Sequence, residues 1–287
     1  MLSRTKFAAE NHPNYKIMLE WTSLLSVLVF VGLAIAEAFY SKKDQLELFD
    51  AKDTQANISM GVITFVTKIG INFLQLALYT FLWENDYVLW KPDVNIVVWY
   101  LIGLLLNDFL FYWYHRISHT TRFFWAVHVA HHSSEKLNIT TSVRGNFLNN
   151  LFHGIFWTPM VLLGFAPWIV ITTDGLSYFY QVWLHTRIIP KLGPFEWMMN
   201  TPSHHRVHHA SNPKYLDKNY AAIFIFWDKL FGTFEEEKEP VKYGLTKPIN
   251  THNPWKIAFH EFESVFKATG EAKGWTRKVR ELFRKPY

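Results

Sequence analysis

The chain has no cysteine among its 287 residues. This absence excludes disulfide bonds, zinc–thiolate sites, iron–sulfur clusters and blue-copper sites, because each of them needs a cysteine sulfur. The basic residues form no stripe interleaved with stacking aromatic side chains, so the formal net charge of +5 does not indicate a nucleic-acid partner. No haem- or flavin-binding module is visible in the sequence either. Redox chemistry by this chain would therefore need an external electron donor.

Histidine, in contrast, is concentrated in one part of the chain, where 11 of the 14 histidines lie between residues 115 and 209. One H-x-x-x-H block and two H-x-x-H-H blocks contain His115, His119, His128, His131, His132, His205, His208 and His209. On a helix, residues three or four positions apart leave the same face, so each block can direct several imidazoles to one place. Imidazole is the commonest protein ligand for metals. Eight imidazoles are too many for one ion, and the pattern predicts two.

Long apolar segments place this pattern in a membrane. Segments 17–40, 58–83 and 96–113 are long enough to cross a bilayer at a helical rise of 1.5 Å per residue. A fourth segment, 146–185, is broken at 164–167 by Gly-Phe-Ala-Pro and is typical of a helical hairpin. We predict an all-α integral membrane protein, in which a transmembrane helical bundle carries a histidine-rich helical cap at the membrane face.

We expect one membrane-embedded domain, 1–287, with its metal-binding core at 108–234. The tail, 263–287, is basic and contains Trp275 and Phe283. A basic segment with aromatic side chains is typical of contact with an anionic membrane surface. A solvated helix explains the same composition, and the sequence leaves both interpretations open.

The predicted hairpin determines which histidines can lie close together. Because it returns the chain to the side that it left, it would bring the second H-x-x-H-H block back beside the first. His185 ends the returning segment, and we predict it as a ninth metal ligand. His204 would point about 100° away from His205 on a helix, so it is left out. His153 lies among apolar residues and is expected in the core.

Basic residues near the histidine blocks, such as Arg116, Arg122 and Arg144, favour the cytoplasmic side for the site by the positive-inside rule. The membrane would be a bacterial inner membrane or the endoplasmic reticulum. The number of spans before His115 is left open.

Four polar residues are candidates for supporting the ligands. Asp108 lies two turns before His115, and a carboxylate at membrane depth is a functional candidate by default. We expect it to accept a hydrogen bond from the other ring nitrogen of a ligand histidine, and Tyr112 to act similarly. Gln181, one turn before His185, is expected to support that residue by hydrogen bonding, and Asn219 to support the second block. Pairing with a neighbouring helix is the alternative for Asp108 and Tyr112, and capping of the helix that carries Trp227 is the alternative for Asn219.

The metal follows from the ligand type and the surroundings. All-imidazole sites suit iron, copper or zinc. A site lined by Phe, Trp and Tyr and opening toward a membrane is better suited to oxidising an apolar substrate than to hydrolysis. We therefore expect two iron ions that use O₂. A metal-binding membrane carrier or sensor without catalysis is the alternative from another class.

The residues around these blocks carry a family resemblance. The chain resembles the fatty acid hydroxylase/sterol desaturase superfamily, integral membrane nonhaem diiron enzymes, through its three histidine blocks. It is most similar to the alkylglycerol (glyceryl-ether) monooxygenase branch over roughly residues 83–262. The matching segments are 125–135 (WAVHVAHHSSE), 200–209 (NTPSHHRVHH), 217–221 (DKNYA), 227–234 (WDKLFGTF) and 243–250 (YGLTKPIN).

The resemblance implies an activity and a cofactor. It implies tetrahydrobiopterin-dependent hydroxylation of the ether-linked carbon of an alkylglycerol lipid, which gives a fatty aldehyde and a glycerol derivative. One departure concerns the pterin, because the branch has a glutamate directly after the second histidine of H-x-x-x-H and this chain has Thr120. Glu135 is the substitute candidate for contacting the pterin. The alternative is a hydroxylase or desaturase of a sterol, fatty acyl chain or carotenoid, supplied with electrons by a separate redox protein.

Overall fold

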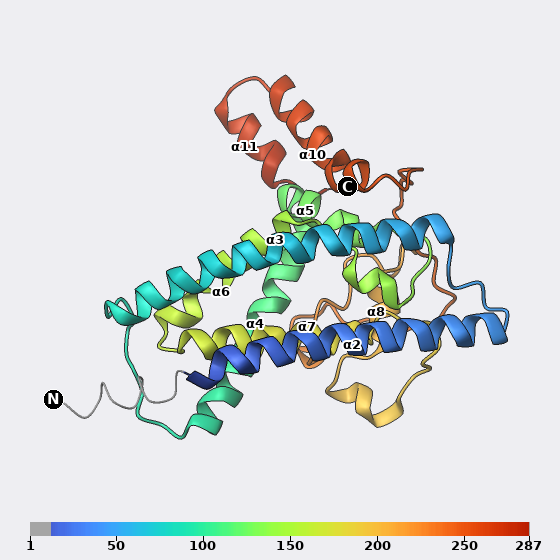
Figure 1. Ribbon diagram of the computed structural model, residues 1–287. Coiled ribbons are helices and arrows are strands. Elements are labelled where there is room, and N and C mark those ends of the chain that lie inside the picture. The colour runs from blue at the N-terminus through green and yellow to red at the C-terminus, as the bar shows by residue number, and fades with distance from the viewer. Residues whose placement is uncertain (1–12, 287) are drawn as a thin grey trace.

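The computed structural model describes residues 13–286, and every regular element in them is a helix (Figure 1). Only two isolated β-bridges, Met199–Phe224 and Ala210–Tyr243, occur in the described part. The α-helices are α2 (Pro13–Lys43), α3 (Ala51–Glu84), α4 (Ile96–Thr120), α5 (Arg122–His132), α6 (Leu148–Leu162), α7 (Pro167–Val182), α8 (Pro202–His208), α9 (Phe226–Leu230), α10 (Pro254–Glu271) and α11 (Trp275–Phe283). Two short 3₁₀ helices are η1 (Ile139–Val143) and η2 (Gly193–Trp197).

The long helices α3 and α4 begin at side-chain caps. The Asp50 carboxylate accepts from the Asp53 backbone N–H at 2.8 Å, and the Asn95 side chain accepts from the N–H groups of Val97 and Val98. Within the described residues, α3 and α4 are the helices long and apolar enough to cross a membrane. Together with the all-helical content, they confirm the predicted fold class, an all-α membrane bundle with a histidine-rich cap. The boundaries of the individual spans stay predictions.

The bundle is built around α4, which packs against α5, α6 and α7. Helices α6 and α7 pack on each other, while α3 lies on α6 and α2 contacts α7 (Figure 1). The core between α4, α6 and α7 contains the buried side chains Trp157, Met160 and Ile169. His153 belongs to this core, as predicted, and its ring stacks on Trp157 with centroids 3.5 Å apart, but its Nε2 makes no hydrogen bond with any described residue and lies 3.5 Å from the Asp174 carboxylate.

The predicted hairpin is formed by α6 and α7. Gly164 lies between them with φ +93°, and a Cβ atom at this position would stand 2.2 Å from the carbonyl oxygen of Trp90. Only glycine accepts both this backbone conformation and this close approach. Pro167 then starts α7, where its missing N–H costs no helical hydrogen bond.

Helix α4 runs past the predicted end of the third apolar segment, from Ile96 to Thr120, and so carries both histidines of the first block. Thr121 has extended backbone angles, and α5 starts at Arg122 in a new direction. The chain therefore turns sharply just after His119, and α5 brings its histidines back to the end of α4.

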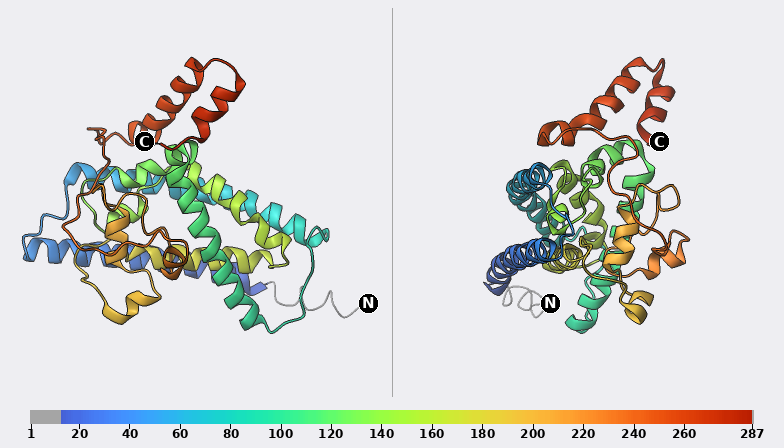
Figure 2. Two further views of the ribbon diagram at one scale, coloured as in Figure 1. Left: turned by 180° about the vertical axis from the view of Figure 1, so that it is seen from behind. Right: turned by 90° about the vertical axis from the view of Figure 1, so that its right-hand side faces the viewer.

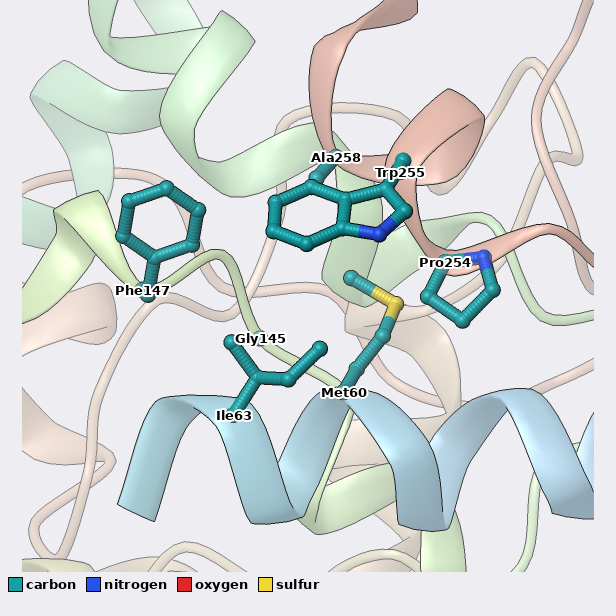
Figure 3. A pocket seen from close by; sticks show the side chains of 7 residues that line it. All are labelled: Met60, Ile63, Gly145, Phe147, Pro254, Trp255 and Ala258. Atoms are coloured by element: carbon teal, nitrogen blue, oxygen red, sulfur yellow. The ribbon is translucent and has the colours of Figure 1, made fainter. Parts of the chain in front are cut away.

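Helices α10 and α11 form a hairpin that packs on α5 and stands apart from the bundle (Figure 2). The start of α10 lies over α3, where Pro254 and Trp255 face Met60 and Ile63 across a cavity of about 10 Å³ (Figure 3). A buried water molecule needs roughly 10–15 Å³. This cavity has room for one water molecule at most and is far too small to bind a lipid.

Candidate metal centre

Nine histidines gather in two groups, and within each group one nitrogen from every ring lies within 4.8 Å of the others. The first group consists of His115, His119, His128, His132 and His208. The second consists of His131, His185, His205 and His209. These are the nine residues that the sequence predicts as ligands. His204 lies outside both groups, with its Nε2 3.9 Å from the Glu196 carboxylate.

Each of the two H-x-x-H-H blocks gives two histidines to one group and one histidine to the other group. The first and third histidines of the α5 block, His128 and His132, belong to the first group, whereas the second, His131, belongs to the other. In the α8 block, His205 and His209 belong to the second group and His208 crosses to the first. The rings of His132 and His209 stack between the groups, with centroids 4.5 Å apart. Each block thus contributes to both groups.

Backbone carbonyl groups fix the orientation of four of these rings. The Nδ1 atoms of the four lie 2.7–3.1 Å from carbonyl oxygens. The pairs are His115 with Tyr220, His131 with Arg144, His185 with Gln181, and His208 with Lys218. A carbonyl oxygen can only accept, so each Nδ1 carries the proton. In a neutral ring of this kind, Nε2 is left with a free lone pair, the form that binds a metal.

The rings are held neutral by burial. Burial lowers the pKa of His131 to about 4, and the pKa values of His132, His205 and His209 also fall well below the ordinary 6.5. His185 is 3% exposed, and its neighbours within hydrogen-bonding distance are imidazoles and carbonyl oxygens. A buried imidazolium without a carboxylate partner is costly. Both His131 and His185 therefore present lone pairs at Nε2, although these two atoms lie only 3.2 Å apart.

Further Nε2 atoms converge within each group. The His115–His128 and His128–His132 distances are 3.0 and 3.1 Å in the first group. In the second group, His185–His205 and His205–His209 are 2.9 and 3.1 Å apart. The Nε2 atoms of His119 and His208 are buried without a hydrogen-bond partner. Buried polar atoms without partners are rare in folded proteins and need an explanation.

Asp108 does not have the role predicted from the sequence. Its carboxylate accepts from the N–H groups of Ile223 and Phe224 at 2.8 and 3.1 Å and from the indole N–H of Trp227 at 3.0 Å. Seven residues on a helix rise by about 10 Å, so a carboxylate two turns before His115 is too far away to reach its ring. Asp108 instead ties α4 to the segment that follows Tyr220.

Tyr112 is likewise not bonded to a histidine ring. Its hydroxyl group lies 2.9 Å from Thr233 Oγ1 and accepts from Arg116 at 3.0 Å. The side chain of Gln181 donates to the Ser177 carbonyl at 3.1 Å, and it is the backbone carbonyl of Gln181 that accepts from His185. The predicted support of His185 by position 181 therefore exists, but it comes from the main chain.

Asn219 and Asp228 shape the loop that presents the carbonyls of Lys218 and Tyr220. Asn219 has φ 55°, donates to the carbonyls of His204 and Glu235, and accepts from the Glu235 N–H at 2.9 Å. The Asp228 carboxylate accepts from the N–H groups of Tyr220 and Ala221, both at 2.8 Å. Because His115 and His208 bond to this loop, its two polar anchors set the orientation of both rings.

A buried ion pair that the sequence did not predict holds the end of α5. The guanidinium group of Arg144, 1% exposed, donates to Asp53 at 2.9 Å and to Asn57 at 2.8 Å on α3. It also donates to the Ala130 carbonyl and the Ser133 hydroxyl, the residues on either side of the His131–His132 pair. The signal in the sequence that could have indicated this ion pair was the presence of an acid and an amide, Asp53 and Asn57, at the start of an apolar helix.

Two residues associated with the pterin lie outside both groups. The Thr120 hydroxyl donates to the Arg116 carbonyl one turn back, which keeps it on its own helix. Glu135 is exposed and lies against Gly244, where an added Cβ would stand 3.0 Å from its Cγ. A role for Glu135 in contacting a pterin stays a prediction.

Comparisons with known proteins agree with this site. Residues 100–233, which contain all nine histidines, match the model of the fatty acid hydroxylase family. The chain is 40% identical over 234 residues to human alkylglycerol monooxygenase, covering 82% of this chain and 52% of the relative. It is 35% identical over 259 residues to the Danio rerio alkylglycerol monooxygenase, covering 90% and 57%.

A bacterial relative is more distant. The ornithine lipid hydroxylase of Rhizobium tropici is 23% identical over 244 residues, covering 82% of this chain and 71% of the relative. No solved structure matches. The chain spans about half the length of the alkylglycerol monooxygenases that it matches. Residues 100–233, the segment that carries both histidine groups, form a fatty acid hydroxylase domain.

Proposed function

We propose that the two histidine groups hold two iron ions and that the chain is an O₂-dependent monooxygenase of ether lipids. The observation that carries the metal assignment is the 3.2 Å contact between Nε2 of His131 and Nε2 of His185. Two lone pairs at this distance repel each other unless a cation lies between them. The unpartnered Nε2 atoms of His119 and His208 support the same assignment for the first group.

The distances between ring nitrogens favour iron over tetrahedral zinc. With metal–imidazole bonds of about 2.0–2.1 Å, ligands at right angles are about 3.0 Å apart, and tetrahedral ligands about 3.4 Å apart. Four of the five contacts between Nε2 atoms measure 2.9–3.1 Å, and the fifth, between His131 and His185, measures 3.2 Å. Right angles between ligands are typical of ions with five or six positions, and an all-imidazole ligand set suits iron.

The chain's own residues would orient the ligands and keep the site dry. Carbonyl groups and the Arg144 ion pair fix the rings, while Trp125 and Tyr220 lie beside them, with ring centroids 5.1 and 5.3 Å from that of His119. Bound iron would supply the activation of O₂. The surrounding aromatic side chains exclude water, which protects a reactive site from side reactions.

An apolar groove beside α4 supports a lipid substrate. It measures about 350 Å³ and includes Leu105 and Phe109 of α4, Phe165 before α7, and Trp227 of α9. Trp227 also donates to Asp108. It lies on the same segment as Tyr220, whose carbonyl group bonds to His115. Apolar lining with few polar groups is typical of sites for hydrocarbon chains. We propose that the alkyl chain of the substrate occupies this groove.

The substrate class is taken from the relatives named alkylglycerol monooxygenase. The ether-linked carbon would gain one oxygen atom from O₂, while the second atom leaves as water after two electrons and two protons are supplied. The resulting hemiacetal breaks its C–O bond to give a fatty aldehyde and a glycerol derivative. Reduced tetrahydrobiopterin is the proposed donor, with the site on the cytoplasmic side of a bacterial inner membrane or the endoplasmic reticulum.

The test is turnover of an alkylglycerol by purified protein, with and without tetrahydrobiopterin, and iron analysis of the same sample. Pterin-dependent aldehyde release with two irons per chain is the expected result. Two irons and turnover only with a ferredoxin or cytochrome donor, on a sterol, acyl or carotenoid substrate, would replace the ether-lipid assignment. Bound metal without any turnover would favour a carrier or sensor.

A further inference from the structure

The excess positive charge of the chain lies in its last helix and the residues beside it. Between residues 272 and 286 there are six basic residues and one acidic residue, Glu281. This difference equals the formal net charge of the whole chain, +5, so the rest of the molecule is balanced. The basic residues are Lys273, Arg277, Lys278, Arg280, Arg284 and Lys285.

Most of these charges are free. Among the described residues, ion pairs of the segment are formed by Glu281, which binds Arg284 at 2.8 Å and Arg122 of α5 at 3.0 Å. Arg277, Lys278 and Arg280 on α11 have no carboxylate within ion-pair distance in the described structure. The one acid of the segment is therefore occupied, and the three cations of α11 are available to an external anion.

Large aromatic side chains accompany these charges. Trp275, at the start of α11, is 80% exposed, and Phe283, at its end, is 57% exposed. Phe266 of α10 is 61% exposed. No residue of α11 is buried. Aromatic rings next to lysine and arginine are typical of the interface between lipid headgroups and acyl chains, where the rings lie in the apolar layer and the cations near the phosphates.

The α10–α11 hairpin is nevertheless fixed to the protein. Arg122, the first residue of α5, donates to Glu261 and Ser264 of α10 and to Glu281 of α11, and its N–H donates to the Arg284 carbonyl at 2.9 Å. Leu282 packs against a cluster formed by Ala126 and Val127 of α5 with Phe262 and Val265 of α10. The hairpin therefore projects from the bundle but is firmly attached to α5 (Figure 2).

We propose that α11 and the tip of the α10–α11 hairpin form a binding surface for anionic lipid headgroups, independent of the metal centre. The occupant is a bilayer surface because the exposed cations and the exposed aromatic rings fit its phosphate and acyl layers together. The hairpin then fixes how α5, which carries three histidines, is held relative to the membrane surface.

The absence of native cysteine permits a direct test with the full-length protein. Trp275→Cys provides a single thiol for an environment-sensitive fluorophore. The labelled protein is placed in nanodiscs of phosphatidylcholine, or of equal parts of phosphatidylcholine and phosphatidylglycerol. We expect a blue shift of emission in the anionic nanodiscs only, and its loss in about 1 M salt, where the screening length falls to about 3 Å.

Two charge variants in the labelled background complete the test. Arg277→Gln/Lys278→Gln/Arg280→Gln should lose the shift, while elution as a monodisperse particle reports that the fold is kept. Lys191→Gln/Lys214→Gln/Lys238→Gln removes the same number of exposed charges from other loops and should keep the shift. Equal emission in both lipids, or an equal shift in the two charge variants, would overturn the proposal.

Discussion

Individual side chains in this protein act on the histidine rings mainly through the main chain. Asp108, Asn219 and Asp228 all bond to backbone groups of residues 218–235, and carbonyl groups of the same segment bond to the rings of His115 and His208. The nine histidines are predictable from the sequence because imidazoles at helical spacing are visible in it. The carbonyl partners of the rings are not predictable, because a carbonyl acceptor can belong to any residue, and the partner role expected of Asp108 was therefore wrong.

At this scale, His185→Ala should remove one metal and leave the other. His185 belongs only to the second group, and its loss opens the pair that it forms with His131. Iron content should fall from two ions to one per chain. His153→Ala, a buried histidine outside both groups, is the matched control and should retain two. Two ions in His185→Ala would contradict its assignment as a ligand.

Asp108→Asn should weaken the fold without emptying the site. The carboxylate accepts three hydrogen bonds, and an amide oxygen cannot replace both carboxylate oxygens. We expect a loss of about 1.5–3 kcal/mol of stability, as for hydrogen bonds to a charged group. Thermal unfolding in detergent measures this, and iron analysis should still give two ions. A loss of iron without a lower melting temperature would contradict this purely structural role of Asp108.

Helices and turns are the scale at which sequence patterns were most informative. Apolar length predicted α3 and α4, and Gly164 with Pro167 predicted the turn between α6 and α7. The Arg144 ion pair could not be predicted, since it joins residues 53, 57, 130 and 133, whose proximity depends on how α3 packs beside the end of α5. The local spacing of apolar residues does not indicate which distant segments come into contact.

Gly164→Ala should destabilise the hairpin. Its φ of +93° and the 2.2 Å approach of the Trp90 carbonyl both oppose a side chain. We expect a cost of more than about 1 kcal/mol, seen as a lower melting temperature. Gly175→Ala is the matched control, because an added methyl group in α7 meets nothing within 4 Å and should stabilise the helix by about 0.5–1 kcal/mol. Equal effects of the two substitutions would refute the turn requirement.

Arg144→Lys should weaken metal binding at the second group. A lysine cannot reproduce the bonds that the guanidinium group makes to Ala130, Ser133 and Asp53 at once. The affinity of that site should fall by about 10- to 100-fold, as for other partners of ligand residues. Arg122→Lys, at the opposite end of α5, breaks a similarly buried ion pair and should leave metal affinity unchanged.

The whole molecule brings α4, α5, α8 and the loop after α7 together at the two histidine groups. Segments 183–201 and 209–253, which contain only the short helices η2 and α9, complete this cap, and no sequence pattern predicted their course. What the sequence did predict is the return of the second block through the hairpin. The topology brings residues from distant segments together, and the apolar segments of the sequence predict that topology. The paths of the loops depend on hydrogen bonds, which the apolar segments do not predict.

Metal removal should destabilise the molecule as a whole. Without a cation, neutral lone pairs such as those of His131 and His185 face each other, and the ions no longer join the four segments. A ligand at 100 times its dissociation constant adds about 2.7 kcal/mol of stability. Treatment with a chelator should lower the melting temperature, and added Fe²⁺ should restore it. An unchanged melting temperature after verified iron removal would argue against a structural role for the metal.

The reciprocal arrangement of the two H-x-x-H-H blocks has a consequence for the ions themselves. His131 and His132 are consecutive and serve different groups, as do His208 and His209, and both pairs have ring centroids 5.4 Å apart. Consecutive Cα atoms are about 3.8 Å apart in any trans peptide. A single peptide bond in each of the two blocks would thus set the separation between two bound ions. Inserting one residue into either block would change which ion the histidines of that block serve.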